Sequence, residues 1–276
     1  MPLRIGQTLH GRYEIQSLLG QGGMGAVYQA HDRVLNHPCA IKELVPPPGL
    51  SASQVDGLRL QFREEAQVLA NLDHPSLPHV IDYFSETGTE YLVMDFVQGV
   101  SLDVLIANEG KRGLEEDRIL DWTAQLLEAL AHCHSHGIIH RDVKPANIII
   151  RPDTPKGPNG RAVLVDFGLV KQRDPQEPRT RTAVRGIGTP EYAPPEQYHS
   201  GPGHTDFRSD IYSLGATLYH ASTGKAPPTA AMRMATPDQF QTPRSLRRNI
   251  SARTEAAILR AMELPIDQRF KSAEQM

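Results

Sequence analysis

The sequence predicts an α+β protein made of a small β-rich part with one helix and a larger, mainly helical part. Within the first hundred residues, short runs of β-branched and aromatic residues alternate with Gly, Pro, Asn and Asp turns, a pattern typical of strands. After Gly99, apolar residues recur at helical spacing over longer stretches. Because the pattern changes near residue 97, we expect one compact part in residues 1–96 and a second in residues 97–276.

The individual elements follow from the same patterns. Strands are predicted at residues 13–19, 26–31, 39–44, 80–84 and 91–96. One amphipathic helix is predicted by the spacing of Leu58, Phe62, Glu65, Ala66 and Leu69. In the second part, helices are predicted at 211–222, at 254–263 and along the stripe of Ile119, Trp122, Leu126, Leu130 and Cys133. Gly137 and Gly224 follow two of these helices as stop signals.

The composition is that of a globular protein. The chain has 276 residues, 39% of them hydrophobic, which is enough to build a core. Lys and Arg number 29 against 32 Asp and Glu, so the net charge of −3 argues against a nucleic-acid binder. The two cysteines, Cys39 and Cys133, exclude a disulfide framework and favour a reducing compartment. No apolar run approaches the ~18–20 residues that span a bilayer, so we expect a soluble, cytoplasmic segment without membrane contact.

Residues 20–27 read Gly-Gln-Gly-Gly-Met-Gly-Ala-Val, which fits the pattern G-x-G-x-x-G-x-V. Glycines let a backbone approach a polyphosphate closely, and their amides can bind its oxygens. A dinucleotide-binding turn is an alternative for which Glu43 is suitably spaced, but that turn needs a helix directly after the glycines. The strand-like residues 26–30 favour a hairpin instead, while a flexible turn without a ligand stays open.

Lys42 lies in the third predicted strand, where most lysines simply face solvent. Glu65 lies between Phe62 and Leu69 on the apolar side of the predicted helix. Because an unpaired buried carboxylate is costly, Glu65 needs a cation, and Lys42 can supply it. Glu64, one position round the helix, is better placed for solvent.

Two further motifs accompany these residues: His140-Arg141-Asp142-Val143-Lys144-Pro145-Ala146-Asn147 and Asp166-Phe167-Gly168. With the glycine loop, Lys42 and Glu65, they make the sequence resemble the eukaryotic-like (Hanks-type) protein kinases, specifically the bacterial serine/threonine kinases. The resemblance covers the chain from Tyr13 to Phe270. It implies a two-lobed protein-kinase-like fold and transfer of the γ-phosphate of ATP to protein Ser and Thr hydroxyls.

The resemblance implies a role for each catalytic residue. Lys42, positioned by Glu65, would bind the α- and β-phosphates, and Lys144 would contact the γ-phosphate. Asp142 would accept the proton of the substrate hydroxyl. Phosphoryl transfer needs positioning and charge neutralisation more than covalent help, which fits these residue types.

The resemblance also implies how ATP and its metal are held. Asn147 and Asp166 would hold Mg²⁺, with Mn²⁺ as an alternative. Met94 would be the gatekeeper residue, and the backbone of Asp95 and Val97 would bind adenine. The whole set expected around ATP is Leu19, Gly20, Gly22, Gly25, Val27, Ala40, Lys42, Met94, Asp95, Val97 and Ile149.

A further group of residues is implied on the side of the protein substrate. Gly188-Thr189 resembles the platform that seats the substrate. Glu196 would close the activation segment by pairing with Arg269. Asp210 would brace the backbone of the catalytic loop.

Thr180 and Thr182 are expected to be phosphorylated by the kinase itself. A phosphothreonine adds about −1.5 to −2 charge, and Arg141, directly before Asp142, is the cation expected to receive it. The alternative is that both threonines are ordinary loop residues.

Two other functions stay open. A pseudokinase that binds nucleotide as a scaffold would have lost a catalytic residue, but Lys42, Asp142 and Asp166 are all present. A small-molecule kinase of related fold would lack the Gly188-Thr189 platform and the Pro195-Glu196 closure.

A cluster of histidines invites a metal-site interpretation: His132, His134, His136 and His140. Alternate positions on a helix such as His132 and His134 point in different directions, which argues against a metal site. His140 is expected to be a buried packing residue under the catalytic loop.

The resemblance also bears on the ends and partners of the chain. Met276 lies in a stretch that begins the last helix of the large lobe, so we expect that helix to be cut short and the domain to come from a longer protein, cytoplasmic or membrane-tethered. Expected partners are protein substrates and a second copy of the chain for autophosphorylation in trans.

Overall fold

The computed structural model describes residues 3–22, 25–109, 112–152, 159–167, 189–197 and 205–276. The chain forms two compact units. Unit 1 comprises Met1–Asp73 and Leu77–Val97, and unit 2 comprises His74–Ser76 and Gln98–Met276. An α+β fold with a sheet-rich first unit and a helical second unit is what the sequence predicts, and this prediction is confirmed.

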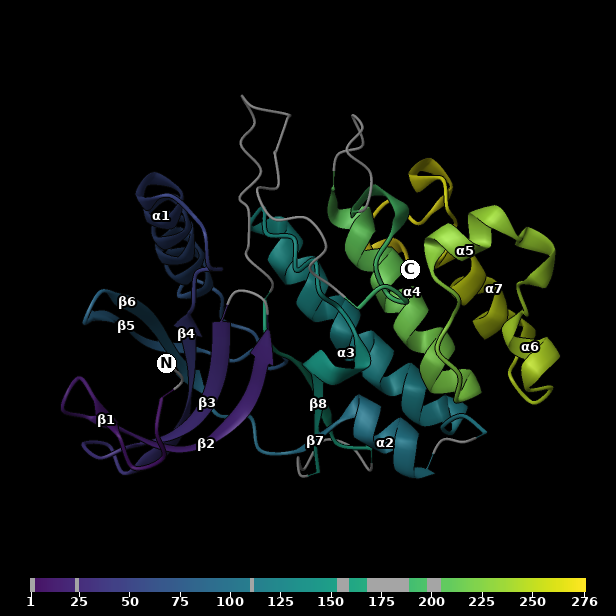
Figure 1. Ribbon diagram of the computed structural model, residues 1–276. Coiled ribbons are helices and arrows are strands. Elements are labelled where there is room, and N and C mark those ends of the chain that lie inside the picture. The colour runs from purple at the N-terminus through teal and green to yellow at the C-terminus, as the bar shows by residue number, and fades with distance from the viewer. Residues whose placement is uncertain (1–2, 23–24, 110–111, 153–158, 168–188, 198–204) are drawn as a thin grey trace. The chain divides into compact units, whose positions relative to one another are not determined.

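Unit 1 is built on an antiparallel sheet (Figure 1). Its strands are β1 (Thr8–Leu9), β2 (Tyr13–Gly22), β3 (Gly25–Asp32), β4 (His37–Leu44), β5 (Val80–Glu86) and β6 (Thr89–Asp95). They lie in the order β1-β2-β3-β4-β6-β5. Strands β2 to β6 coincide with the five predicted runs to within a few residues, because β-branched residues and turn signals mark them clearly.

Helix α1 (Ala52–Leu69) packs against β5 and β6 in unit 1. Its N-terminus is fixed by a capping box, in which the Ser51 hydroxyl accepts from the backbone of Gln54 and the Gln54 side chain accepts from the backbone of Ser51. The buried residues of the helix are those of the predicted apolar stripe: Leu58, Phe62, Glu65, Ala66 and Leu69. The stripe therefore carries one carboxylate into the core.

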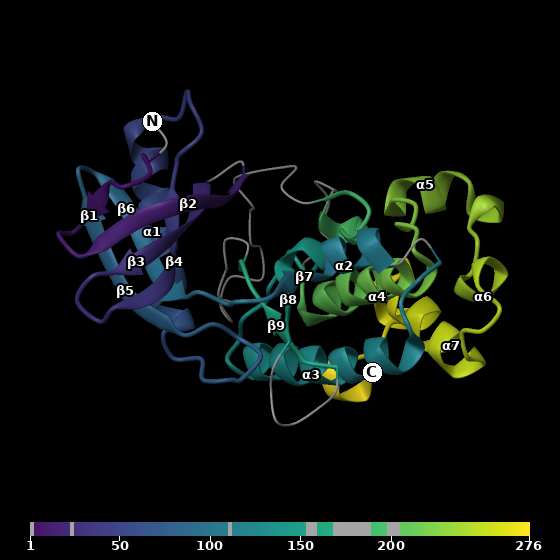
Figure 2. The ribbon, with the colours of Figure 1, turned by 90° about the horizontal axis from the view of Figure 1, so that it is seen from below.

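Unit 2 contains α2 (Leu102–Glu109), α3 (Glu116–Ser135), α4 (Phe207–Thr223), α5 (Ala230–Ala235), α6 (Pro243–Leu246) and α7 (Ala252–Ala261). A small antiparallel sheet of β7 (Val100–Ser101), β8 (Ile148–Arg151) and β9 (Arg161–Leu164) lies against α3 through β9 (Figure 2). The sequence patterns predict α3, α4 and α7, but they miss the short helices and this sheet, whose elements span too few residues to show a period. Among the described residues, no helix combines the length and the apolar character needed to cross a membrane.

Helix α4 is the centre of unit 2. It is buried along most of its length and contacts α3, α6 and α7. At Gly215 the two helices α4 and α7 are so close that a Cβ atom would lie 2.7 Å from the Cβ of Ala261, which excludes a larger residue. The helix ends at Gly224, which has a left-handed φ of 71° and donates its N–H to His220, as the sequence predicts for a stop signal.

Candidate active site

The glycine-rich segment forms the β2–β3 hairpin of unit 1. Gly22 pairs with Gly25 and Gly20 pairs with Val27, with the turn itself outside the described residues. A Cβ atom on Gly25 would lie 2.1 Å from the backbone oxygen of Glu43 on β4, so only glycine fits there. The glycines are followed by strand β3 and not by a helix, which excludes the dinucleotide-binding alternative.

Lys42 and Glu65 form an ion pair between β4 and α1. The distance from Lys42 Nζ to Glu65 Oε1 is 3.5 Å, and the carboxylate side is fully buried while the lysine side chain is 15% exposed. Glu64 points to solvent. The pairing that the sequence favours is therefore the one the structure contains, and it fixes an ammonium group on β4 that keeps part of its surface accessible.

The residues expected around adenine in unit 1 lie on β2, β3, β4 and β6 or directly after β6. Leu19 lies on β2 and Val27 on β3. Ala40 on β4 is opposite Met94 on β6. Asp95 is the last residue of β6, and its carboxylate is bound by the backbone N–H and the ring of His79, which directly precedes β5. Ile149, expected to contact the same ligand, lies on β8 of unit 2 opposite Val163.

His79 joins two carboxylates at the edge of this segment. Its Nδ1 lies 2.9 Å from Asp95 Oδ2 and its Nε2 lies 3.1 Å from Asp73 Oδ1, and its backbone N–H also donates to Asp95. The hydrogen bond with Asp95, and then the one with Asp73, raise the pKa of His79.

The raised pKa of His79 predicts that its contacts with Asp95 and Asp73 contribute to stability in a pH-dependent way. A histidine whose pKa is higher in the folded than in the unfolded chain stabilises fully below its unfolded pKa of about 6.5, and the gain is lost as the pH rises through the folded value. We therefore expect His79→Ala to destabilise more at pH ~5.5 than at pH ~8.5. Urea denaturation of wild type, His79→Ala and Asp95→Asn at both pH values measures this. A His79→Ala effect that is equal at both pH values would contradict the assignment.

The catalytic-loop motif of unit 2 gathers three polar side chains. Asp142 Oδ2 accepts hydrogen bonds from Lys144 Nζ at 2.8 Å and from Asn147 Nδ2 at 2.9 Å. Asn147 Nδ2 also donates to the backbone oxygen of Asp142. The short turn Pro145–Asn147 makes this possible, because it brings Asn147 back under Asp142. The result is a carboxylate that is 19% exposed and has a fixed orientation next to an ammonium group.

The backbone of this loop is tied to Asp210 at the first turn of α4. Asp210 accepts from the N–H groups of His140 at 2.9 Å and Arg141 at 2.8 Å, and from His134 Nε2 at 2.9 Å. Burial by itself would raise the pKa of Asp210, but the hydrogen bonds and charge of His134 and the backbone donors outweigh it and lower the pKa. Asp210 is therefore a charged, fully buried acceptor that holds the loop.

Asp166 and Phe167 follow β9. The N–H of Val165 donates to the backbone oxygen of Asn147, which joins the segment of Asp166 to the catalytic loop. Asp166 has a left-handed φ of 56°, and the ring of Phe167 packs on His140 with centroids 4.5 Å apart. Gly168, the last residue of this motif, lies outside the described residues.

The residues expected to bind a divalent cation, Asn147 and Asp166, offer ligand atoms that suit a hard metal ion. Asn147 Nδ2 donates a hydrogen bond to the Asp142 carboxylate, so the amide oxygen of Asn147 faces away from that carboxylate. An amide oxygen and the carboxylate of Asp166 are the ligand types that Mg²⁺ takes, together with phosphate oxygens. Among the described residues, no group of three or more His, Cys, Asp or Glu could hold a metal by itself.

The histidine cluster of the sequence is divided among separate contacts. His134 binds Asp210, His140 packs on Phe167, and His136 Nδ1 lies 2.9 Å from the backbone oxygen of His132. The packing role expected for His140 is present. His134, for which the sequence predicts no role, is a partner of the buried Asp210. Its spacing of four residues from the buried Leu130 was the available signal.

Residues 189–197, which are expected on the side of the protein substrate and are called the substrate-side segment below, are anchored at their end by an ion pair. Arg269 Nη1 lies 2.7 Å from Glu196 Oε1, and Nη2 lies 3.0 Å from Oε2. Ser209 also donates to Glu196, and the guanidinium lies over the ring of Tyr212. Thr189 lies in the turn that precedes this anchor, where its backbone oxygen accepts from Tyr192 N–H. Thr180, Thr182 and Gly188 lie outside the described residues.

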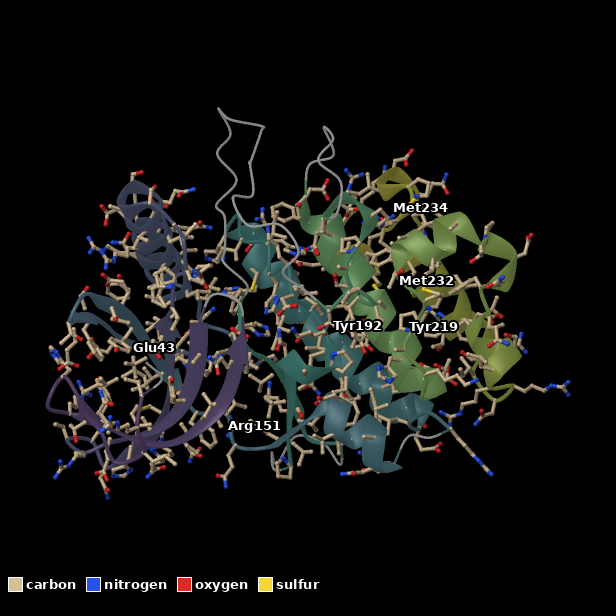
Figure 3. The ribbon with its side chains drawn as sticks, in the orientation of Figure 1. Glu43, Arg151, Tyr192, Tyr219, Met232 and Met234 are labelled. Atoms are coloured by element: carbon tan, nitrogen blue, oxygen red, sulfur yellow. The ribbon has the colours of Figure 1, made fainter. Side chains whose placement is uncertain are left out.

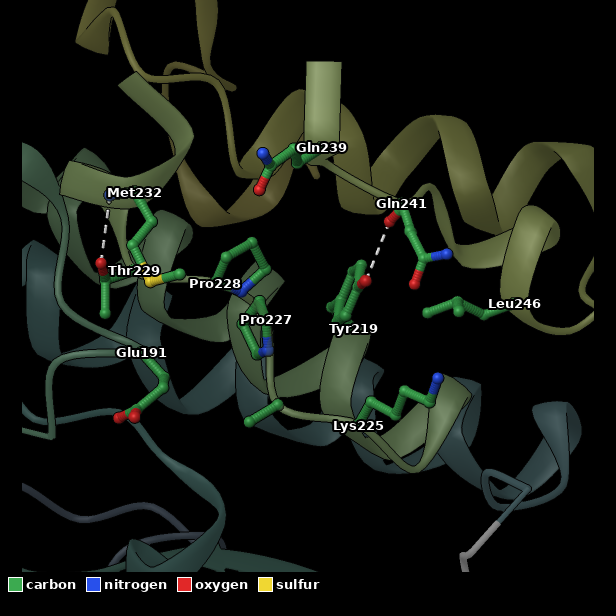
Figure 4. A pocket seen from close by; sticks show the side chains of 11 residues that line it. Glu191, Tyr219, Lys225, Pro227, Pro228, Thr229, Met232, Gln239, Gln241 and Leu246 are labelled. Carbon is green, nitrogen blue, oxygen red and sulfur yellow. Dashed lines mark hydrogen bonds between the residues drawn. The ribbon is translucent and has the colours of Figure 1, made fainter. Parts of the chain in front are cut away.

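A pocket of about 380 Å³ lies elsewhere in unit 2, beside α4 and α5 (Figure 4). Tyr219, Pro227, Pro228, Met232 and Leu246 give it apolar walls, and its charged lining residues are Glu191 and Lys225. Met232 is 55% exposed on α5, where Figure 3 shows it near Met234. None of the residues of the catalytic loop lines this pocket, so the chemistry described above is not located there.

Comparisons with known proteins agree with this geometry. The protein kinase domain family matches residues 13–265. Serine/threonine-protein kinase PknB of Mycolicibacterium smegmatis is 35% identical over 282 residues, covering 98% of this chain and 42% of that protein. Serine/threonine-protein kinase PknA of Mycobacterium tuberculosis is 38% identical over 233 residues, covering 82% of this chain and 50% of that protein. The chain thus spans half or less of the length of these curated relatives.

Solved structures show the same likeness. The kinase domain of Mycobacterium tuberculosis PknI matches with a TM-score of 0.73 and 28% identity over 100% of this chain and 96% of that one. A structure described as PpkA-294 in its apo form matches with a TM-score of 0.76 and 27% identity over 99% of this chain and 97% of that one. The fold, the order of the motifs along the chain and the similar proteins lead to one conclusion: the chain belongs to the protein kinase family and is a catalytic domain of the bacterial serine/threonine type.

Proposed function

We propose that this domain transfers the γ-phosphate of ATP to serine and threonine hydroxyls of proteins, with Asp142 as the group that accepts the hydroxyl proton. The observation that carries the proposal is the orientation of the Asp142 carboxylate, fixed by Lys144 and Asn147 on a loop that Asp210 holds. One carboxylate oxygen is occupied by these two donors, so the other is the natural acceptor for a substrate hydroxyl.

The other polar groups act on the charge of the phosphates. Lys42, held by Glu65, neutralises the α- and β-phosphates, and Lys144 neutralises the γ-phosphate. The amides of the β2–β3 hairpin cover the phosphates, because Gly20, Gly22 and Gly25 present no side chain to them. Adenine is bound by Leu19, Val27, Ala40, Met94, Ile149 and the backbone of Asp95 and Val97.

A divalent cation supplies Lewis-acid charge at the phosphates when it is bound. Asn147 and Asp166 are the residues that would hold it, and Asn147 is kept in the right orientation by its hydrogen bond to Asp142. Mg²⁺ is the proposed ion, with Mn²⁺ as a substitute of the same ligand preference.

The proposed extent of the two lobes is residues 1–96 and 97–276. Thr189 with Gly188 is the proposed platform for the protein substrate, and a second copy of the chain is the proposed partner for autophosphorylation in trans. Because ATP is an intracellular substrate and Cys39 and Cys133 are free, we place the domain in the cytoplasm.

The test is a transfer assay with radiolabelled ATP and Mg²⁺ on a general protein substrate, comparing wild type with Asp142→Asn. Label on serine and threonine with wild type, and its loss in the variant, supports the proposal. A pseudokinase would bind ATP but give no label with either protein. A small-molecule kinase would consume ATP without labelling protein.

Autophosphorylation of Thr180 and Thr182 is proposed as the activating modification. Arg141 supports it, because burial lowers the pKa of its guanidinium and its Nε has no hydrogen-bond partner among the described residues. A buried cation of this kind gains from an added anion, and charge-assisted hydrogen bonds are worth ~1.5–3 kcal/mol each.

We expect mass spectrometry of the purified wild-type enzyme to find phosphate on Thr180 or Thr182, and to find none in Asp142→Asn. The double variant Thr180→Ala/Thr182→Ala should turn over about three- to tenfold more slowly, because the charge-assisted contact with Arg141 is lost. Full activity of the double variant would remove this modification from the mechanism.

A further inference from the structure

Arg141 has a left-handed backbone, with a φ of 67°. A residue with a side chain adopts this conformation rarely and only where its surroundings impose it. Arg141 directly precedes Asp142, so the conformation of Arg141 sets the position from which the Asp142 carboxylate is presented. The contacts that impose it are therefore part of how the proposed base is placed.

Three hydrogen bonds hold the two peptide groups on either side of Arg141. The N–H of Arg141 donates to Asp210 Oδ1 at 2.8 Å. The peptide group that joins Arg141 to Asp142 is held at both ends: its N–H donates to His140 Nδ1 at 3.3 Å, and its oxygen accepts from Gln197 Nε2 at 3.2 Å. With both ends bonded, this peptide plane cannot rotate without breaking a contact.

Gln197 reaches the loop from the anchored end of the substrate-side segment. It is the last residue of the short turn Pro195–Gln197, and its N–H donates to the oxygen of Pro194. The residue before it, Glu196, is paired through both carboxylate oxygens with the buried Arg269. The Gln197 amide is thus carried by a rigid turn, 56 residues away in sequence from the loop it contacts.

Resting on the proposed function, we propose that Gln197 is a positioning residue for the reaction. Its side-chain amide holds the Arg141 oxygen, keeps Arg141 left-handed and so fixes the backbone of Asp142. The turn that closes the substrate-side segment is then joined to the loop of the proposed base by one hydrogen bond, from Gln197 Nε2 to the Arg141 oxygen, and transfer is fast only while that turn is anchored.

The test measures kcat and the KM for ATP separately in Gln197→Ala and Gln197→Glu. The Glu variant keeps the size of the side chain but, when ionised, has no donor for the Arg141 oxygen. We expect kcat to fall about three- to tenfold in both variants, as for one lost hydrogen bond, with the KM for ATP changed by less than about twofold. Gln67→Glu, the same change on the exposed side of α1, is the matched control and should match wild type.

A second measurement separates positioning from a general loss of structure. Glycine adopts a left-handed φ about as readily as a right-handed one, whereas alanine does not. If Gln197 keeps residue 141 left-handed, Gln197→Ala should reduce kcat less in an Arg141→Gly background than in an Arg141→Ala background. Equal losses in the two backgrounds, or wild-type kcat in both Gln197 variants, would overturn the proposal.

The outcome is distinguishable from failure of the proposed function. An active wild type with unaffected Gln197 variants removes only the positioning role. A wild type that transfers no phosphate to protein, in the assay given above, removes the proposed function itself. Thermal unfolding of each variant confirms that kcat is compared between folded proteins.

Discussion

Lys42→Ala is expected to slow phosphoryl transfer about 10²- to 10³-fold, the usual result of removing one electrostatic group aimed at developing charge. The ammonium group on β4 is held in place by the buried Glu65 carboxylate, and an alanine side chain has no charge with which to neutralise phosphate there. Asp166→Ala should have an effect of the same order, since it removes a proposed metal ligand. Steady-state rates with radiolabelled ATP measure both.

The two acidic residues of α1 provide the control for Lys42. Glu65→Ala should reduce activity less than Lys42→Ala, because the lysine can still reach phosphate with poorer orientation. Glu64→Ala should be harmless, because Glu64 is exposed. Lys42→Ala also takes the ion-pair partner from a buried carboxylate, so its fold is checked by circular dichroism, whereas Asp166→Ala leaves that pair intact. A harmless Glu65→Ala with a crippling Glu64→Ala would show that the site is assigned to the wrong face of the helix.

Arg269→Ala is expected to destabilise unit 2 by about 3–5 kcal/mol, because it leaves the Glu196 carboxylate without its buried cation. The Arg269 side chain is fully buried and that of Glu196 is 9% exposed. The remaining donors of the guanidinium go to backbone oxygens of residues 208, 263 and 264, which lose their partner as well. Urea denaturation followed by tryptophan fluorescence measures the change, since Trp122 is buried in unit 2.

The exposed pair of Arg118 and Glu109 serves as the comparison. Its side chains are 32% and 47% exposed, and Glu109→Ala should cost at most about 1 kcal/mol. The double variant Glu196→Ala/Arg269→Ala should lose less stability than the sum of the two single variants, because the two residues act on each other. A loss below about 1 kcal/mol in Arg269→Ala would mean that the segment is anchored by other contacts.

Sequence reasoning predicts strands β2 to β6 of unit 1 from their β-rich runs between turn residues, and helices α1, α3, α4 and α7 from their helical period. It also predicts the pairing of Lys42 with Glu65 from the residues themselves, since a carboxylate among Phe62 and Leu69 requires a cation. The pairing of Glu196 with Arg269 and the bracing role of Asp210 follow only from the family resemblance. Both contacts join positions far apart in sequence, and no local pattern encodes them.

The contacts that the sequence does not predict share one physical origin. His134 and Asp210 are 76 residues apart, and Gln197 and Arg141 are 56 apart, so each meeting depends on how α3, α4 and the substrate-side turn pack. The position of His134, four residues after the buried Leu130 on α3, predicts that it is buried but not which residue it contacts. Gln197 belongs to no run with a period or a charge pattern that marks it. The roles of such residues follow only from the three-dimensional structure, because they depend on which distant residue each side chain meets.

The bonds from the catalytic loop to Asp210 also have a consequence for hydrogen exchange. Loops usually exchange their amide protons quickly, because small local openings expose them. The amide protons of His140 and Arg141 are instead bound to a carboxylate with no exposed surface at the first turn of the central helix. They can be replaced by deuterium only when that helix parts from the loop, so these two amides report the opening of the core of unit 2, and an active-site loop exchanges at the rate of a buried helix.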